Sequence, residues 1–594
     1  MTVSYFKSIL LYFFSLTLFF NSITIISTSK FIFAPMEQIN TIPGFQKLWQ
    51  LIIQTKREIG ALYFYAVFSG LLQLVVPVGI QAIVGFTLGA QMVTSVYLLI
   101  GLVILSVWLV GILQIKQMRV VESIQQQTFV RNAFEFSETI PNIALDKSEK
   151  YYLPEKANRF FDTVILQKGF SKILLDIPQA FIQLFLGLIL LSFYHQVFIV
   201  FSFLLCFVLW LIFYLSGKQG IASSIAESNY KYQVADWLED LARVIRSFKF
   251  SHGSHLNLRK TDTQVTSYLK ARNTHFRILL LQFRTLLALK IIITSTMLIA
   301  GTILLVQQKL NVGEFIAAEI VILSIIAAVE KLISNLENVY DVITALEKLS
   351  AVTNLPREQS GSNLLSNSID KIDLQLDQIH FAYQANKPVL QNISIQIPWG
   401  NKVAVTGMEA SGKSTLLMLL SGMIQHYQGN YLLNDIPFHD FQLQSFREIA
   451  SLYSHKQDVF KGSVLENITL SRSTVDSQQI YALAKDLGIA EFLYKLPKGL
   501  DTEIDSEGLQ FPSSTLRKIM LLRALIHKPK LVFMEEPWYG FTPEEKNQML
   551  HYLLSKTTST VIIVTADPIF CKECDQVIAL HNGQITSIQT KNHD

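Results

Sequence analysis

A glycine-rich stretch in the second half of the chain has the residue types and spacing of a phosphate-binding loop. The apolar runs Val403–Thr406 before it and Leu416–Leu420 after it predict a strand, a loop and a helix. Glycines let successive backbone N–H groups converge on phosphate oxygens, and the helix start adds a partial positive charge. The sequence therefore predicts a nucleoside-triphosphate site in which Lys413 contacts the β- and γ-phosphates and Ser414 offers its hydroxyl to Mg²⁺. The stretch consists of Gly407, Met408, Glu409, Ala410, Ser411, Gly412, Lys413, Ser414 and Thr415.

The composition is too apolar for a chain made only of soluble domains. Half of the 594 residues are hydrophobic, 16% are charged and 40 are phenylalanine. Because soluble cores need less apolar surface than this, part of the chain is expected to lie in lipid. The formal net charge of +4 is too small to indicate nucleic acid as a partner. The three cysteines form no disulfide framework, which fits a reducing cytosolic side.

The first 350 residues contain six apolar runs long enough to cross a hydrocarbon layer of about 30 Å as helices. Short gaps join the runs in pairs, and longer gaps separate the pairs. The predicted spans are Ala61–Phe86, Ser95–Ile115, Ile173–Tyr194, Val197–Leu215, Ile278–Val306 and Phe315–Ile333.

The two long gaps, residues 116–172 and 217–277, are rich in lysine and arginine. The positive-inside rule places them in the cytosol, and the phosphate loop then falls on the same side of the membrane. Apolar residues at helical spacing, such as Val234, Trp237 and Leu238, predict that the membrane helices extend into water. We expect these extensions to turn through short segments that dock on another domain.

The chain is expected to divide into four parts. Residues 1–56 form an N-terminal segment whose apolar run, Ile9–Thr28, predicts a signal anchor or a seventh span. Our hypothesis is that Met36 is the natural start and that the residues before it are extraneous. Residues 57–350 are the predicted transmembrane domain, 351–371 a polar linker and 372–594 a nucleotide-binding domain. The expected fold is an all-α membrane domain of six helices fused to an α/β P-loop domain.

This arrangement resembles a bacterial ABC exporter half-transporter from about Trp49 to the C-terminus. The run from Val312 through Tyr340 to Lys348 is similar to that of the type I secretion and peptide-exporting branch. The resemblance implies a dimer of two halves, with ATP and Mg²⁺ between cytosolic nucleotide domains. It also implies that the protein lies in membrane lipid and exports a protein or peptide across the cytoplasmic membrane. In a Gram-negative cell it further implies a periplasmic adaptor and an outer-membrane channel as partners.

The resemblance assigns further site residues. Tyr383 matches the aromatic residue that stacks on adenine, and the alternative is a tyrosine that packs into the core. Glu536 matches the catalytic acid that polarises the attacking water. Glu535 stands where the family has an aspartate for Mg²⁺, and its longer side chain changes the geometry. Gln457 matches the glutamine that contacts Mg²⁺ only if its loop bulges.

Other positions depart from the family pattern. Pro512, within the signature, has neither a hydroxyl nor an N–H, and Ser513 and Ser514 are expected to cap the next helix. Ala566 stands where the family has the switch histidine, and Thr542 where it has the aspartate of the D-loop. The residues that align with the family signature are Phe511, Pro512, Ser513, Ser514 and Thr515.

These departures predict intact ATP binding with hydrolysis that is weak or that depends on a partner half-transporter. Loss of one transition-state donor typically slows an enzyme by about 10²–10³-fold. Three functions stay open from the sequence. The chain is a protein or peptide exporter, a lipid or drug exporter, or a non-catalytic, ATP-binding regulatory half of a heterodimer.

Cys571 and Cys574 form a lone C-x-x-C pair. We expect ordinary thiols, since no second cysteine pair is present, and a redox pair or a metal site is the alternative.

Overall fold

The computed structural model describes residues 48–49, 51–53, 55–88, 94–145, 153–251, 254–365, 371–384, 387–454, 459–472, 475–506 and 508–591. By its internal contacts the chain forms two units, which are described separately. One unit comprises most of the residues up to Asn354, and the other comprises Pro141–Tyr151 together with Leu355–Asp594. The expectations for Met36 and for the run Ile9–Thr28 concern residues outside the described ranges.

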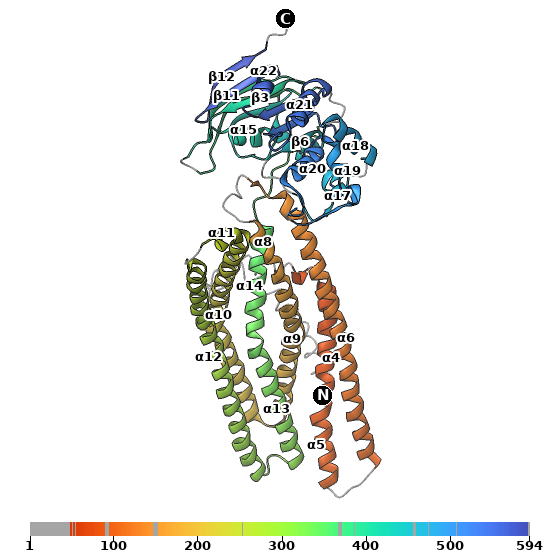
Figure 1. Ribbon diagram of the computed structural model, residues 1–594. Helices are drawn as coiled ribbons and strands as arrows, with labels where there is room; N and C mark the ends of the chain where they lie inside the picture. Colours follow the sequence, from red (N-terminus) through yellow and green to blue (C-terminus); the bar gives the residue numbers. More distant parts are fainter. Residues whose placement is uncertain are drawn as a thin grey trace. The chain divides into compact units, whose positions relative to one another are not determined.

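The first unit is built from long helices joined by short turns (Figure 1). Among the described residues, six helical segments are long and apolar enough to cross a membrane, and each contains one of the six predicted spans. The prediction of a six-helix membrane domain is therefore confirmed. The long helices are α4 (Lys56–Gln73) with α5 (Val75–Leu88), α6 (Thr94–Thr139), α9 (Asp162–Tyr194), α10 (Gln196–Arg243), α12 (Leu256–Val306), and α13 (Val312–Ser334) with α14 (Leu336–Thr353). The short ones are η2 (Ile140–Asn142), α8 (Leu153–Asn158), η3 (Arg159–Phe161) and α11 (Ile245–Lys249).

Three of these helices are much longer than a bilayer is thick. α6, α10 and α12 have 46, 48 and 51 residues. At a rise of 1.5 Å per residue each is about 70 Å long, against about 30 Å of hydrocarbon. The predicted extension of the membrane helices beyond the bilayer is confirmed, and the second basic gap consists of α10, the short α11 and α12.

Close packing between α10 and α14 centres on a tyrosine. Tyr340 of α14 is buried, and its hydroxyl accepts a hydrogen bond from Gln282 Nε2 of α12 at 2.7 Å. Gly220 of α10 faces the Tyr340 ring so closely that an added Cβ would overlap it. A hydrogen bond of 2.8 Å between the hydroxyls of Ser224 and Thr344 joins the same two helices. The small residues of α10 therefore let α14 approach its backbone.

The second unit contains a six-stranded sheet in the order β12-β11-β3-β10-β9-β6 and a four-stranded antiparallel sheet in the order β2-β1-β4-β5. In the larger sheet β11, β3, β10, β9 and β6 run parallel, and β12 (Gln584–Thr590) is antiparallel to β11 (Gln576–His581). The other large-sheet strands are β3 (Lys402–Gly407), β6 (Ala450–Tyr453), β9 (Leu531–Glu535) and β10 (Thr560–Val564). The antiparallel sheet is formed by β1 (Leu374–Phe381), β2 (Leu390–Ile397), β4 (Gln428–Leu433) and β5 (Ile436–Pro437), and β7 (Gly462–Ser463) pairs with β8 (Glu503–Ile504).

Helices complete the α/β fold that the sequence predicted. The central strands β9 and β10 are almost continuously apolar and buried, as expected of parallel strands covered on both faces. The helices are α15 (Lys413–Leu420), α16 (Leu443–Ile449), α17 (Val464–Thr469), α18 (Ser477–Asp486), α19 (Ala490–Tyr494), α20 (Ser513–Leu525), α21 (Pro543–His551) and α22 (Pro568–Glu573), with single turns η4 (Phe438–Asp440) and η5 (Gly499–Asp501) and the π-helical η6 (Tyr552–Lys556).

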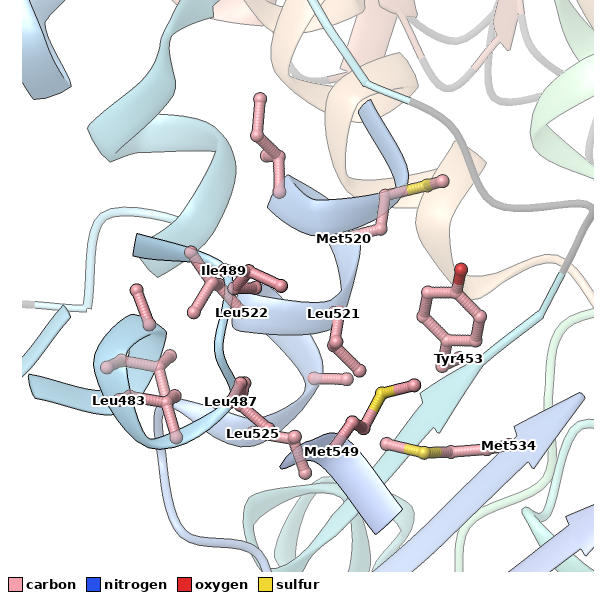
Figure 2. Packing of buried hydrophobic residues seen from close by; sticks show 14 of the residues in the cluster. Tyr453, Leu483, Leu487, Ile489, Met520, Leu521, Leu522, Leu525, Met534 and Met549 are labelled. Carbon is pink, nitrogen blue, oxygen red and sulfur yellow. The ribbon is translucent and has the colours of Figure 1, made fainter. Parts of the chain in front are cut away.

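Two hydrophobic cores hold this unit together. One lies around the antiparallel sheet and α15. The other packs the helices from α17 to α21 against strands β3, β10, β9 and β6 of the large sheet, and Figure 2 shows its centre. There, Leu521 and Leu525 of α20 belong to the same buried cluster as Met549 of α21 and Met534 of β9 (Figure 2). This core packs α20 and α21 against the large sheet.

The turn of the first basic gap belongs to the second unit. Ile143 forms an antiparallel bridge with Arg357, where the predicted linker begins. Backbone hydrogen bonds of 2.9 Å run from the Ala144 N–H to the Pro356 carbonyl and from the Glu358 N–H to the Asn142 carbonyl. A short segment of that gap therefore pairs with the linker, and docking of the long gaps on another domain stays a prediction.

The substitution Gly220→Ala tests the packing around Tyr340. We expect it to lower the free energy of unfolding by about 1–3 kcal/mol, because the added methyl overlaps a buried ring. The measurement is the thermal midpoint of the purified protein in detergent. Gly217→Ala, on the same helix with nothing within 4 Å of an added Cβ, is the matched control. Equal midpoints for the two variants would contradict the packing argument.

Candidate nucleotide site

Two glycines of the predicted phosphate loop have positive φ angles and lie close to neighbouring backbone carbonyls. β3 ends at Gly407, and Gly412 is the N-cap of α15, with φ angles of +144° and +98°. A side chain at Gly407 would overlap the Leu580 carbonyl of β11, and one at Gly412 would lie 3.0 Å from the Val389 carbonyl oxygen. Glycine meets both demands, since it adopts positive φ and has no Cβ.

One non-glycine residue of the loop is also left-handed. Ala410 has a φ of +61°, a conformation that costs an L-residue about 1 kcal/mol. Neighbouring contacts hold the loop in place: the Gly583 N–H donates to the Ser411 carbonyl at 3.1 Å, and the Ser411 N–H donates to the Met408 carbonyl at 3.3 Å. Both bonds involve Ser411, the residue after Ala410, and one of them comes from the turn between β11 and β12. Together they hold the strained backbone of Ala410 in place.

The loop brings together the lysine and the serine that the motif requires. Lys413 Nζ donates to the carbonyls of Gly407 at 2.9 Å and Met408 at 2.6 Å, so its ammonium lies across the loop. Ser414 Oγ donates to Glu535 Oε1 at 2.5 Å, in the range of a charge-assisted hydrogen bond. Two segments 121 residues apart in the sequence therefore meet at one point.

The Ser414–Glu535 pair has the chemistry of a Mg²⁺ site. Both side chains offer hard oxygen atoms, and Mg²⁺ usually takes one or two carboxylates plus substrate phosphates and water. In the part of the chain that the structure describes, no group of three or more His, Cys, Asp or Glu side chains is arranged to hold a metal. A fully protein-made metal cage is therefore not seen there. The longer glutamate at position 535 still reaches the serine hydroxyl.

Glu536, the candidate catalytic residue, is held by the end of β10. It has a positive φ of +42°, which turns the chain sharply after β9. Its carboxylate accepts from Thr565 Oγ1 at 3.2 Å and from the Ala566 N–H at 3.3 Å. Ala566, where the resemblance predicts a histidine, therefore contacts Glu536 through its backbone, and Thr565 is a partner that sequence reasoning missed.

Tyr383 lies just after β1, at an end of the β1–β2 hairpin. It is half-buried against the core of the antiparallel sheet, and its ring packs edge-to-face on Phe381, with the centroids 4.7 Å apart. Val389, at the other side of this hairpin end, contacts the phosphate loop at Gly412 as described above. Adenine stacking stays a prediction for Tyr383, whose packing on Phe381 also matches the alternative.

The aligned signature residues begin α20, but the expected serine caps are absent. The N-cap of α20 is Pro512, which has no side-chain capping bond, and Ser513 and Ser514 are the first helical residues. The expectation that these serines cap the helix is therefore wrong, because the helix begins one residue earlier than that role requires. Phe511 is half-buried against the second core, and Thr515 donates its N–H to the Pro512 carbonyl at 2.9 Å.

The loop expected to contact Mg²⁺ is described only in part. Ser454, at the start of that loop, is buried directly after β6. Gln457 lies outside the described residues, so its role stays a prediction.

Thr542, which the resemblance aligned with the D-loop aspartate, is the N-cap of a helix. Its hydroxyl accepts from the Glu545 N–H at 3.2 Å, and Glu545 Oε2 accepts from the Thr542 N–H at 3.0 Å. This capping box starts α21. The sequence Thr-Pro-Glu-Glu carries the signal for it, a threonine followed three residues later by glutamate.

Asp567 caps α22 and forms an ion pair with a lysine that sequence reasoning did not identify. Its carboxylate accepts from the N–H groups of Ile569 and Phe570, both at 3.1 Å, and forms an ion pair with Lys546 of α21. Burial alone raises the pKa of Asp567, but the bonds from Lys546 and the two N–H groups outweigh it, so the pKa lies below its usual value. The Asp567 N–H in turn donates to Thr565 Oγ1 at 3.1 Å, which links this cap to the group beside Glu536.

Comparisons with known proteins agree with this geometry. Residues 390–539 match the family model described as ABC transporter. The fold is similar to that of a bacterial Atm1-family ABC exporter solved with ATP bound, with a TM-score of 0.81 at 15% identity over 90% of this chain and 95% of that chain. This chain has the fold of an ABC exporter half-transporter.

Curated relatives of this exporter-fold chain differ in what their names say they transport. The lactococcin-G-processing and transport ATP-binding protein of Lactococcus lactis subsp. lactis is 22% identical over 341 residues, 57% of this chain and 48% of the relative. The ATP-dependent lipid A-core flippase of Haemophilus influenzae is 26% identical over 300 residues, 49% of this chain and 50% of the relative. The chain thus spans about half the length of these curated relatives, which leave the transported class open.

The C-x-x-C pair of this ABC exporter fold has the geometry of two ordinary thiols. All three cysteines are free. Cys574 is buried, and its Sγ lies 3.5 Å from the Cys571 carbonyl oxygen and 3.4 Å from that of Gln576. Burial, with a smaller effect of Cys571, raises the pKa of the Cys574 thiol to about 11.

Alkylation of the native protein tests this assignment. Because the thiolate is the nucleophile and its fraction grows as pH approaches the pKa, we expect Cys574 to react very slowly with iodoacetamide at pH 8. At that pH about one thiol in a thousand is ionised. Mass spectrometry of the labelled peptide measures the rate, with the urea-unfolded chain as control. Rapid native labelling, or a disulfide between Cys571 and Cys574, would favour a redox pair.

Proposed function

We propose that this chain is an ATP-binding ABC exporter subunit of the cytoplasmic membrane, with its nucleotide domain in the cytosol. In this proposal, nucleotide binding and hydrolysis drive export of a protein or peptide. The observation that supports it most directly is the meeting of Lys413, Ser414 and Glu535 at the carboxyl ends of β3 and β9. The described residues of the same chain include six helices able to cross a membrane, so the proposed energy source and transport path are covalently joined.

The loop residues would divide the work of nucleotide binding. The backbone N–H groups of residues 407–415 and the start of α15 would bind phosphate oxygens, and Lys413 would neutralise charge on the β- and γ-phosphates. Ser414 and Glu535 would hold Mg²⁺, which supplies charge neutralisation at the phosphates when bound. Glu536 would orient and deprotonate the attacking water. Tyr383 would stack on adenine.

We further propose that two identical copies hydrolyse ATP slowly. In the family, groups from the partner's signature close the site, and here that segment presents Pro512 at the start of α20, with no side-chain cap. Ala566 offers only a backbone N–H where an imidazole is expected, and Thr542 is engaged in capping α21. A partner half-transporter with a regular signature would complete the site built on Gly407–Thr415.

The peptide-exporting branch is our choice of transported class, with a periplasmic adaptor and an outer-membrane channel as partners in a Gram-negative cell. The similarity to the lactococcin-G transport protein supports it, and the similarity to the lipid A-core flippase supports a lipid or drug exporter as the alternative. The Pro512 and Ala566 departures favour a second candidate function, a regulatory half that binds ATP but hydrolyses little.

ATP binding is tested with Lys413→Ala. We expect the affinity for a fluorescent ATP analogue to fall at least about tenfold, because a charge-assisted contact of about 1.5–3 kcal/mol is lost. Fluorescence titration of the detergent-purified protein with Mg²⁺ measures this. Lys485→Ala, at an exposed position of α18, is the control and should bind as the unchanged protein does. Equal affinities for both variants would rule out the proposed loop.

Hydrolysis is tested by repairing the departures. A repaired variant should raise ATP turnover of the protein alone by at least about 10²-fold, since several transition-state contacts are restored. Its substitutions are Phe511→Leu, Pro512→Ser, Ser513→Gly, Ser514→Gly, Thr515→Gln and Ala566→His. Adding Glu536→Gln to the repaired variant should abolish the gain. The assay is phosphate release from nanodiscs. If the unchanged protein already turns over as fast as the repaired one, hydrolysis does not depend on a partner.

A further inference from the structure

The membrane unit contains a cavity of about 400 Å³ among α4, α5, α6, α9 and α13. This volume lies at the small end of the range for ligand pockets, about 300–1,000 Å³. The cavity reaches from Gln73, in the middle of the first predicted span, to the ends of the second and sixth spans. Much of its wall is apolar, and it contains no carboxylate. Its larger polar side chains are Gln73, Gln114, Gln179, Gln183, Ser324 and Lys331.

Three of the glutamines have no partner in the described parts of the chain. Gln183 Nε2 donates to Ser324 Oγ at 2.6 Å, which fixes that amide. By contrast, no hydrogen bond joins the side chains of Gln73, Gln114 or Gln179 to any described residue. Gln73 and Gln179 lie within predicted spans, where polar groups are costly unless satisfied and mark ligand paths, whereas Gln114 is exposed at the end of the second span. Each amide both donates and accepts, as the peptide backbone does.

Lys331 gives the cavity its one positive charge. Its ammonium forms no ion pair with any residue of the described ranges, although it lies on α13 within the polar wall. A single ammonium beside three amides differs from the clusters of basic residues that recognise anionic lipid headgroups. The arrangement suits one carboxylate flanked by amides.

The break between α4 and α5 adds a backbone feature to the same wall. α4 ends at Gln73 and α5 begins at Val75, with Pro77 in its first turn. Proline has no N–H to donate to the carbonyl four residues earlier, which is that of Gln73. Irregular helix at membrane depth is tolerated where it lines a cavity, and interrupted helices often carry binding sites.

We propose that this cavity binds the C-terminal carboxylate and adjoining backbone of an extended peptide segment. Lys331 pairs with the carboxylate, and Gln73, Gln114 and Gln179 pair with the backbone amides. The inference rests on the proposed export function, since it identifies where an exported peptide first contacts the membrane domain.

Photo-cross-linking of the full chain in phosphatidylcholine nanodiscs tests this site. The probe is N-acetyl-alanyl-benzoylphenylalanyl-alanine with a free C-terminal carboxylate, compared with the same peptide as its C-terminal amide. We expect the carboxylate form to label residues that line the cavity about tenfold more than the amide form does. Lys331→Met should remove this preference, and Lys331→Arg should retain it, since the charge is kept. Gln73→Leu and Gln179→Leu should reduce labelling by both peptides alike.

Gln81→Leu is the matched control, because Gln81 lies on α5 but lines a different cavity. It should label as the unchanged protein does. Equal labelling by both peptides, a preference that survives Lys331→Met, or loss of labelling when phosphatidylglycerol replaces phosphatidylcholine would overturn the proposal. The assay contains no nucleotide, so its failure is distinct from failure of ATP binding at Lys413.

Discussion

The nucleotide unit depends on contact between backbones at the phosphate loop. At Gly407 the loop touches the Leu580 carbonyl of β11, and at Gly412 it approaches the Val389 carbonyl of the β1–β2 hairpin. Because neither position has room for a Cβ, the end of β3 lies next to both sheets. That contact sets where α15 begins, and with it the positions of Lys413 and Ser414. Any larger residue at Gly407 would separate the loop from β11.

The features that sequence reasoning recovered are encoded locally. Apolar runs of about 20 residues identified the six spans seen among the described residues, because span length is set by bilayer thickness. The glycine spacing identified the β3–loop–α15 unit, because the loop needs glycines at fixed positions of a short stretch of sequence. The sheet order β12-β11-β3-β10-β9-β6 was beyond such reasoning, because it joins strands far apart in the sequence. The same holds for Thr565, whose contact with Glu536 depends on the register of β9 against β10.

Residues at or next to the positions that differ from the family pattern stabilise the local structure. Thr542 caps α21, and Asp567, next to Ala566, caps α22 while pairing with Lys546. The error over Ser513 and Ser514 has a related origin. Their residue types suit a cap, but the conformation of Pro512 lets the helix start one residue earlier. A residue type shows what a side chain can do, and the backbone decides which position does it.

Binding and hydrolysis place different demands on the sequence. Phosphate binding rests largely on backbone N–H groups and a helix start, which persist as long as Gly407 and Gly412 keep the loop closed. Hydrolysis rests on side chains that reach the reacting atoms, and each of these is lost by one substitution. A chain under relaxed demand for turnover would therefore lose the histidine and the signature before it lost the loop. A complete loop beside residues that depart from the family pattern agrees with the proposal that a partner supplies the missing side chains.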